Sequence, residues 1–259
     1  MSKRVVLEIK DLYYSYRGSR DYALKKINMS VSEGEIVSLL GPNGSGKTTL
    51  LKIIARILDN YSGQVKLFDK NLREYDPREY SRLVSYVPQI ENISTPYTVF
   101  EYVLIGRSPY INLIKVSDRD IKKSLEAIHL VGIEDLINRR INELSGGEAQ
   151  LARIARALAQ EPKIILLDEP TSHLDLGNKV KILRLIRSLS KNGFTIIFTT
   201  HDPNEALSVS NKVYVLNKGS VIAKGDPVEI LSKELIERLY SVNTIMFKND
   251  RFVLLYPEI

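Results

Sequence analysis

An almost wholly apolar run, Ile36–Leu40, is followed directly by the sequence Gly41-Pro42-Asn43-Gly44-Ser45-Gly46-Lys47-Thr48-Thr49. These residues fit the pattern G-x-x-x-x-G-K-[S/T], placed between a buried strand and a helix that apolar periodicity predicts over Thr48–Leu58. Glycines let successive backbone N–H groups curve around a phosphate, and the start of the helix adds positive partial charge. Lys47 is expected to reach the β and γ phosphates of a nucleotide, and the Thr48 hydroxyl to hold Mg²⁺. The sequence therefore predicts a phosphate-binding loop from Gly41 to Thr49.

The rest of the chain surrounds this loop with strands and helices. Further buried-strand patterns occur at Ile164–Leu167, Thr195–Thr200 and Val213–Leu216, with helices predicted between the first two. Such alternation implies a mostly parallel sheet with helices packed on it. The first forty residues instead read as strands, among them Val5–Ile9 and Leu12–Tyr16. These patterns together predict an α/β fold.

A mostly helical block interrupts the α/β pattern at about residues 90–159, and Asp118 is expected to cap one of its helices. The block resembles an insertion into the core. We therefore expect one nucleotide-binding domain over residues 1–259, with the core and a β subdomain in about 1–89 and 160–225. The remaining tail, 226–259, is too short for a separate regulatory domain.

Composition excludes several classes of protein. The 259 residues contain 37 Lys and Arg against 31 Asp and Glu, a net charge of +6, and 44% are hydrophobic. The absence of cysteine excludes a disulfide framework and cysteine-based metal sites or catalysis. Like charges never run beyond pairs, so no nucleic-acid partner is expected. The stretch Met1–Glu8 lacks the apolar core of a secretory signal, and no apolar run reaches the length of a membrane helix. We expect a soluble chain inside the cell.

A second chemical motif follows the run Ile164–Leu167, which ends in Asp168-Glu169-Pro170. A carboxylate at the end of a buried strand beside a phosphate loop can hold Mg²⁺, directly or through water. Neighbouring side chains of an extended chain point in opposite directions, so Asp168 and Glu169 are expected to have different roles. Asp168 suits the metal, and Glu169 suits polarisation of the attacking water.

A third motif, Leu144–Glu148, opens a predicted helix. Ser145 and Glu148 have the spacing of a capping box. The cap does not explain Gly146 and Gly147, which expose backbone N–H groups at the positive end of the helix, where a phosphate is the natural ligand. Because the chain already has one phosphate loop, this tip implies either two nucleotides or one nucleotide shared between subunits.

The order and approximate spacing of the phosphate loop, Leu144–Glu148, Ile164–Pro170 and a later His201 resemble those of ABC-transporter ATPase subunits. The resemblance runs from about Leu7 to Gly225. It implies a P-loop NTPase (RecA-like) core with a mostly parallel sheet, an N-terminal antiparallel β subdomain and an inserted α-helical subdomain. It also implies Mg²⁺-dependent ATP hydrolysis by a head-to-tail dimer, in which the Ser-Gly-Gly tip of one copy covers the γ-phosphate held by the other.

The resemblance assigns three further residues by position. Gln89 is similar to the glutamine that senses Mg²⁺ and water and faces the membrane partner, and His201 is similar to the switch histidine that contacts the γ-phosphate. Asp175 is similar to an aspartate that reaches across the dimer. Without the other motifs, Gln89 would be interpreted as a surface turn and His201 as a structural histidine. His129 and His173 do not match the switch position.

Tyr16 resembles the aromatic residue that stacks on adenine, although Tyr13 and Tyr14 lie close by and core packing is a competing interpretation for all three. Three positions depart from the family pattern. Glu148 stands where glutamine is common, Leu151 where a basic residue is frequent, and Asp69 where glycine is usual. These departures affect the fine tuning of the site rather than hydrolysis itself, because Ser145, Gly146 and Gly147 match the pattern.

The segment Thr98–Tyr110, which contains Gly-Arg-Ser-Pro at Gly106–Pro109, resembles a segment of importers of iron–siderophore complexes, haem and cobalamin. Thr199–Ala206 also resembles that group, including relatives that handle molybdate or tungstate. This likeness implies transmembrane permease subunits as partners, an extracytoplasmic substrate-binding protein acting through them, and a place on the cytoplasmic face of the cell membrane. The alternatives are a soluble ABC ATPase without a transport role and the nucleotide-binding subunit of an exporter.

Overall fold

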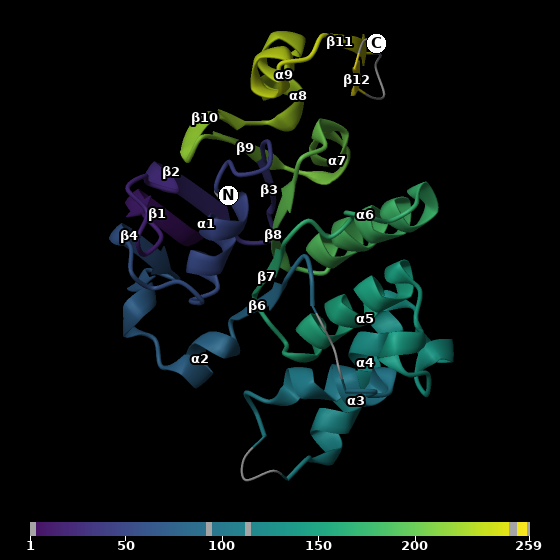
Figure 1. Ribbon diagram of the computed structural model, residues 1–259. Coiled ribbons are helices and arrows are strands. Elements are labelled where there is room, and N and C mark those ends of the chain that lie inside the picture. The colour runs from purple at the N-terminus through teal and green to yellow at the C-terminus, as the bar shows by residue number, and fades with distance from the viewer. Residues whose placement is uncertain (1–3, 92–94, 112–114, 249–252, 258–259) are drawn as a thin grey trace. The chain divides into compact units, whose positions relative to one another are not determined.

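The computed structural model describes residues 4–91, 95–111, 115–248 and 253–257 (Figure 1). Met1 to Lys3, which belong to the stretch used above to argue against a secretory signal, lie outside the described residues. The chain divides into two compact units. The first contains residues 1–75 and 186–259, and the second contains residues 76–185. The helical block expected at about 90–159 lies within the second unit.

An antiparallel sheet forms the N-terminal part of the first unit. Its strands lie in the order β2-β1-β4-β5. They are β1 (Val5–Tyr14), β2 (Leu24–Ser32), β4 (Ser62–Leu67) and β5 (Lys70–Asn71). The two separate strands expected at Val5–Ile9 and Leu12–Tyr16 are one strand, so that expectation was wrong. The register with β2 shifts between Ile9 and Leu12, where Asp11 has a φ of +44°, and this irregularity broke the alternation without ending the strand.

The second sheet of the first unit carries the phosphate loop. Strand β3 (Ile36–Leu40) pairs in parallel with both β8 (Thr195–Thr200) and β9 (Lys212–Asn217), and β10 (Ser220–Gly225) is antiparallel to β9. Every residue of β3 and β8 is buried, as expected for a parallel strand covered on both faces.

Two helices of the first unit follow these strands directly. Helix α1 (Lys47–Ile54) follows β3 and α7 (Pro203–Val209) follows β8. Helix α1 ends before the predicted Leu58, because Ala55 caps it and Arg56 has a φ of +58°.

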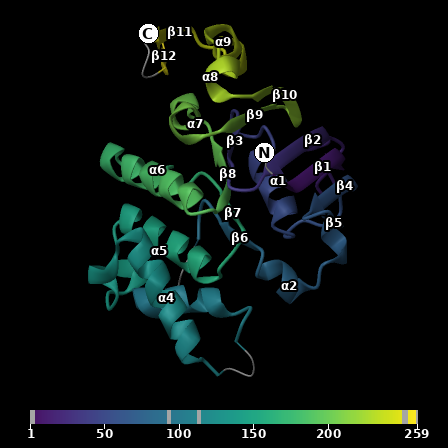
Figure 2. The same cartoon turned by 180° about the vertical axis from the view of Figure 1, so that it is seen from behind.

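The second unit contains the strand pair β6 (Val84–Val87) and β7 (Ile164–Leu167), which is parallel, and most of the helices. The helices of this part are α2 (Pro77–Ser81), α3 (Val99–Leu104), α4 (Asp118–Val131) and α5 (Gly146–Ala159), with α6 (Leu176–Lys191) continuing into the first unit and 3₁₀ turns at Ile105–Arg107, Glu134–Leu136 and Ile141–Glu143. A further 3₁₀ turn, Leu72–Glu74, belongs to the first unit. Helices α3 and α4 both pack on α5, and Figure 2 shows α4 beside α5. The predicted cap of α4 was wrong by one residue, because Ser117 rather than Asp118 accepts from the helix N–H groups, in a capping box with Asp120.

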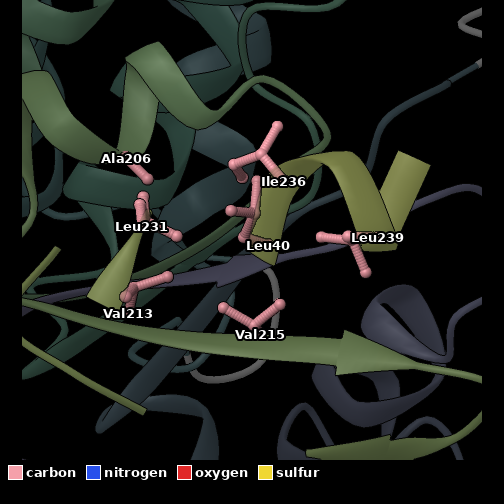
Figure 3. Packing of buried hydrophobic residues seen from close by; sticks show 7 residues of the cluster. All are labelled: Leu40, Ala206, Val213, Val215, Leu231, Ile236 and Leu239. Atoms are coloured by element: carbon pink, nitrogen blue, oxygen red, sulfur yellow. The ribbon is translucent and has the colours of Figure 1, made fainter. Parts of the chain in front are cut away.

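The C-terminal tail folds onto the first unit. It contains α8 (Pro227–Ile230), α9 (Lys233–Tyr240) and the antiparallel pair β11 (Thr244–Lys248) and β12 (Val253–Pro257). Figure 3 shows the apolar cluster that joins the tail to the strands and to α7. Its members are Leu40, Ala206, Val213, Val215, Leu231, Ile236 and Leu239. No helix among the described residues is long and apolar enough to cross a membrane.

A buried arginine ties the helices of the second unit together. The side chain of Arg107 is 1% exposed, and its Nε lies 3.0 Å from Oδ1 of Asp120 on α4. One terminal nitrogen of the guanidinium donates to the Ala159 carbonyl at 2.6 Å and to Glu161 at 2.9 Å. Hydrogen bonds from Ser117, and the bond and charge of Arg107, lower the pKa of Asp120. Arg107 belongs to the Gly-Arg-Ser-Pro segment, so the structure gives this part of the importer-like motif an internal role.

We expect Arg107→Ala to lower the free energy of unfolding by about 3–5 kcal/mol, because it leaves the buried carboxylate of Asp120 without its cation. Arg119→Ala is the matched control, since its side chain is 73% exposed and lies 3.8 Å from Glu161. Thermal unfolding of both variants tests this role. Equal melting temperatures for the two would contradict it.

Candidate nucleotide site

The backbone of the phosphate loop requires glycine at Gly46. This residue caps α1 with a φ of +103°, in the left-handed region that side chains disfavour. A Cβ atom there would also lie 2.8 Å from the carbonyl oxygen of Ala23 and from Cδ2 of Leu24. Glycine at this position therefore lets the loop turn directly into the helix and leaves the first N–H groups of α1 facing the loop.

Lys47 and Ser45 provide polar groups inside the loop. Lys47 is 4% exposed, and its ammonium group donates to the carbonyl oxygens of Gly41 at 2.8 Å and Pro42 at 3.1 Å. The Ser45 hydroxyl is buried and has no hydrogen-bond partner among the described residues. A buried ammonium and an unsatisfied hydroxyl beside a helix start are the groups that phosphate oxygens satisfy. The loop therefore fits a nucleotide phosphate, with Thr48 in the first turn of α1.

Tyr16 lies against the phosphate loop. Its hydroxyl is 2.9 Å from Oγ1 of Thr49, which is buried, whereas the Tyr16 side chain is 44% exposed. Tyr14 is 7% exposed and packs edge-to-face on Tyr16, with ring centroids 5.0 Å apart. Tyr13 stacks on Tyr22 in the same way. Of the three candidate tyrosines, Tyr16 thus combines an exposed ring with a contact to the loop.

The pairing of β3 with β8 brings His201 to the same sheet edge as the phosphate loop. Leu40 lies opposite Thr200 in the parallel register, so Gly41 and His201 are the next residues of neighbouring strands. The N–H of Gly41 donates to the carbonyl of Thr200 at 3.4 Å. The first unit thus brings together Tyr16, the loop from Gly41 to Thr49, and His201.

The second unit brings Gln89 to Glu169. These residues follow the parallel strands β6 and β7, in which Val87 lies opposite Leu167. Nε2 of Gln89 donates to a Glu169 carboxylate oxygen at 3.1 Å. Gln89 therefore orients the carboxylate that was assigned to the attacking water.

Asp168 has a different partner. It is 2% exposed and accepts from the Tyr86 hydroxyl at 3.2 Å. Burial and the nearby carboxylate raise the pKa of Tyr86, so this tyrosine remains a proton donor. The two acidic side chains do separate, but the reason given from sequence was wrong. Glu169 has a φ of +45° and is therefore not extended.

Ser145 caps α5 as predicted. Its hydroxyl lies 2.7 Å from Oε2 of Glu148, and its backbone N–H donates to the same oxygen at 2.8 Å. These hydrogen bonds lower the pKa of Glu148, so a negative charge stands beside the helix tip. A Cβ atom on Gly146 would meet nothing closer than Leu174, at 3.7 Å. Packing therefore does not require glycine at Gly146, which is exposed, so a ligand can approach the backbone at the tip.

Asn178 is a residue that the sequence analysis missed. A Cβ atom on Gly147 would lie 2.4 Å from Cγ of Asn178, so glycine is required there for close packing. Asn178 also donates to both carboxylate oxygens of Asp175, at 2.9 Å and 2.6 Å. These hydrogen bonds lower the pKa of Asp175. The aspartate that was expected to reach across a dimer is thus oriented by a side chain packed on the Ser-Gly-Gly tip.

The predicted site residues fall into two groups, one in each unit. Gln89, Asp168, Glu169, Asp175 and the tip from Ser145 to Gly147 belong to the second. Among the described residues there is no cluster of three or more acidic, histidine or cysteine side chains that could hold a metal alone. Thr48 lies in the first unit and Gln89 and Asp168 lie in the second, and each has an oxygen of the kind that Mg²⁺ binds; their joint role as metal ligands stays a prediction.

Comparisons with known proteins identify the family. The sequence model described as "ABC transporter" matches residues 24–172. The chain belongs to the ABC transporter family. It is an ABC-type ATPase with a P-loop NTPase fold, as the motifs predicted. An uncharacterized ABC transporter ATP-binding protein of Methanocaldococcus jannaschii is 40% identical over 92% of each chain.

Two further relatives are named as import proteins. A petrobactin import ATP-binding protein of Bacillus anthracis is 31% identical over 98% of this chain and 93% of its own. A spermidine/putrescine import ATP-binding protein of Borreliella afzelii is 34% identical over 88% of this chain and 65% of its own.

Solved structures show the same fold. A transporter assigned to the metal-chelate type, in an inward-facing conformation, matches with a TM-score of 0.86 and 31% identity, covering 98% of both chains. A dimeric ATP-binding cassette with ADP and phosphate bound matches with a TM-score of 0.75 and 32% identity, covering 85% of this chain and 98% of that one. The predicted α/β fold class is therefore confirmed.

We expect Lys47→Ala to weaken ATP binding by about 10- to 100-fold, because it removes a charged donor to the phosphates. Lys52→Ala, in the last turn of the same helix, should bind ATP as the unchanged chain does. Calorimetric titration with ATP measures both. Equal affinities for the two variants would show that the loop lysine does not hold the phosphates.

Proposed function

We propose that this ATPase powers an importer of an iron–siderophore, haem, cobalamin or related metal-chelate or oxyanion substrate. The observation that supports this best is the match over 98% of both chains to a transporter assigned to the metal-chelate type. The petrobactin relative and the motifs at Gly106–Pro109 and Thr199–Ala206 agree with it. The polyamine relative has similar identity, so sequence likeness supports import more strongly than it supports one cargo.

In the proposed mechanism, Lys47 and the loop amides hold the phosphates of ATP, and Tyr16 stacks on the adenine. Thr48, Gln89 and Asp168 would hold Mg²⁺, which would supply positive charge near the phosphate oxygens. Glu169, held by Gln89 at 3.1 Å, orients a water molecule and accepts its proton as the water oxygen bonds to the γ-phosphorus, while the bond to the β-phosphate oxygen breaks and ADP leaves. His201 donates to the γ-phosphate.

Capping of α5 accounts for Ser145 and Glu148 but not for Gly146, and the chain already has a phosphate loop. We infer that the tip covers the γ-phosphate held by a second copy, with Asp175 reaching across the same interface. The exposure of Gly146 and the dimeric cassette with ADP and phosphate support this arrangement. ATP then acts as a ligand that binds the closed dimer better than the open one, and hydrolysis reopens it.

The proposed partners are transmembrane permease subunits and, through them, an extracytoplasmic substrate-binding protein. The chain then lies on the cytoplasmic face of the cell membrane, held there by the permease. Gln89 transmits the movement of the dimer to that partner. Arg107 contributes to this function by holding the helical insert together, because its side chain is buried within that insert.

Glu169→Gln should bind ATP with unchanged affinity and lose about 10²–10⁴-fold in turnover, because the amide keeps the shape of the side chain but cannot take a proton. Phosphate release at saturating ATP measures the loss. The control is Glu126→Gln, whose carboxylate pairs with Lys123 at 2.9 Å on the surface of α4. Turnover of Glu169→Gln equal to that of the control would remove Glu169 from the mechanism.

The importer proposal is tested through its partners. Genes for a multi-helix permease and a secreted binding protein beside the gene for this chain are expected. The purified binding protein should bind a ferric siderophore, haem or cobalamin with micromolar or tighter affinity, measured by fluorescence quenching. A binding protein that takes spermidine and none of these would overturn the cargo assignment, and the absence of both genes would favour a soluble ATPase.

A further inference from the structure

The C-terminal tail contacts the loop that carries His201. The Tyr240 hydroxyl, at the end of α9, donates to the backbone carbonyl of His201 at 2.7 Å. The two residues are 39 positions apart in sequence. Around this bond, tail residues and residues 201–204 line a cleft of about 480 Å³. A residue with no part in the family motifs thus contacts the backbone of the residue that completes the proposed site.

Hydrogen bonds within the loop hold the residues on either side of His201. The Thr200 hydroxyl donates to Glu205 at 2.6 Å and accepts from the N–H of Asp202 at 3.0 Å. Asp202 in turn caps α7 by accepting from the N–H of Asn204 at 2.9 Å. The hydrogen bond to the carbonyl of His201 itself comes from the tail. That carbonyl belongs to the peptide plane joining residues 201 and 202, so its orientation constrains ψ of His201, and ψ in turn limits the rotamers that the imidazole can adopt.

The hydroxyl of Tyr240 is itself held in place. Ile236 and Leu239, on the same helix, are 2% and 6% exposed and belong to the apolar cluster that includes Leu40 and Ala206 (Figure 3). Leu40 is the last residue before the phosphate loop, and Ala206 lies in the helix that follows His201. After α9, Ser241 takes a left-handed conformation, and the N–H of Thr244 donates to Glu237 at 2.8 Å. The tail, the strand end before the loop and the helix after the histidine are therefore packed as one body.

We propose that Tyr240 is a positioning residue for His201, and that the tail thereby helps to orient this histidine toward the γ-phosphate. This inference rests on the role proposed for His201. The contact is to a backbone carbonyl, so Tyr240 acts on the direction of the imidazole and not on its chemistry. Nucleotide binding depends on the phosphate loop and Tyr16, and it should not depend on Tyr240.

Tyr240→Phe removes the hydroxyl and keeps the ring packed against the apolar cluster. We expect kcat for ATP hydrolysis by the full chain to fall about 3- to 10-fold with KM unchanged, as expected for the loss of one hydrogen bond felt in the transition state. Tyr256→Phe, a tyrosine of the same cleft that is 56% exposed, is the matched control and should leave both constants unchanged. In a His201→Gln background, Tyr240→Phe should have no further effect.

A second measurement requires no activity. The chain has three histidines, His129, His173 and His201, so their ring signals can be distinguished in carbon–proton correlation spectra. Tyr240→Phe should shift or broaden the His201 ring signals and leave the other two unchanged. Unchanged His201 signals, or an equal loss of kcat with and without His201, would overturn the positioning role. Normal turnover of His201→Gln would instead contradict the proposed function of His201.

Discussion

The parallel register between β3 and β8 is the constraint on which the first half of the site depends. It places Leu40 opposite Thr200, so the chain leaves two neighbouring strands at the same edge with the phosphate loop on one side and His201 on the other. Both strands are buried along their whole length, and a shift by one residue would exchange the side chains that pack on their two covered faces. The hydrophobic core therefore fixes the relative positions of the phosphate loop and the residue His201.

A second parallel pair, β6 and β7, arranges the other half in the same way. It places Gln89 beside Glu169 and leaves Asp168 buried against Tyr86. The residues proposed to hold phosphate thus belong to one compact unit, and the residues proposed to activate water and to form the signature tip belong to the other. In the proposed cycle, ATP favours the closed dimer because it binds that state better than the open one.

The local parts of this arrangement could be predicted from the sequence. Each of these parts is marked by a pattern that spans only a few residues. The patterns are a glycine-rich run between an apolar strand and a helix, an S-x-x-E cap, and acidic residues after a buried run. Contacts between distant segments could not be predicted. Nothing near Asn178 shows that it packs on Gly147, and an arginine is normally expected at the surface, so the burial of Arg107 was not foreseen. The tail was interpreted from its length alone, which does not reveal its bond to His201.

The central claim is that one ATP is held by the loop of one copy and covered by the tip of another. Mixing two inactive variants tests it most directly. Lys47→Ala removes the charged donor of the phosphate loop and leaves the Ser-Gly-Gly tip intact. Ser145→Arg blocks the tip and leaves the phosphate loop intact. In a head-to-tail dimer of one copy of each, one site has an intact loop facing an intact tip. We predict that the mixture regains hydrolysis that neither variant has alone. A mixture as inactive as its components, measured at the same total protein concentration, would contradict the shared site.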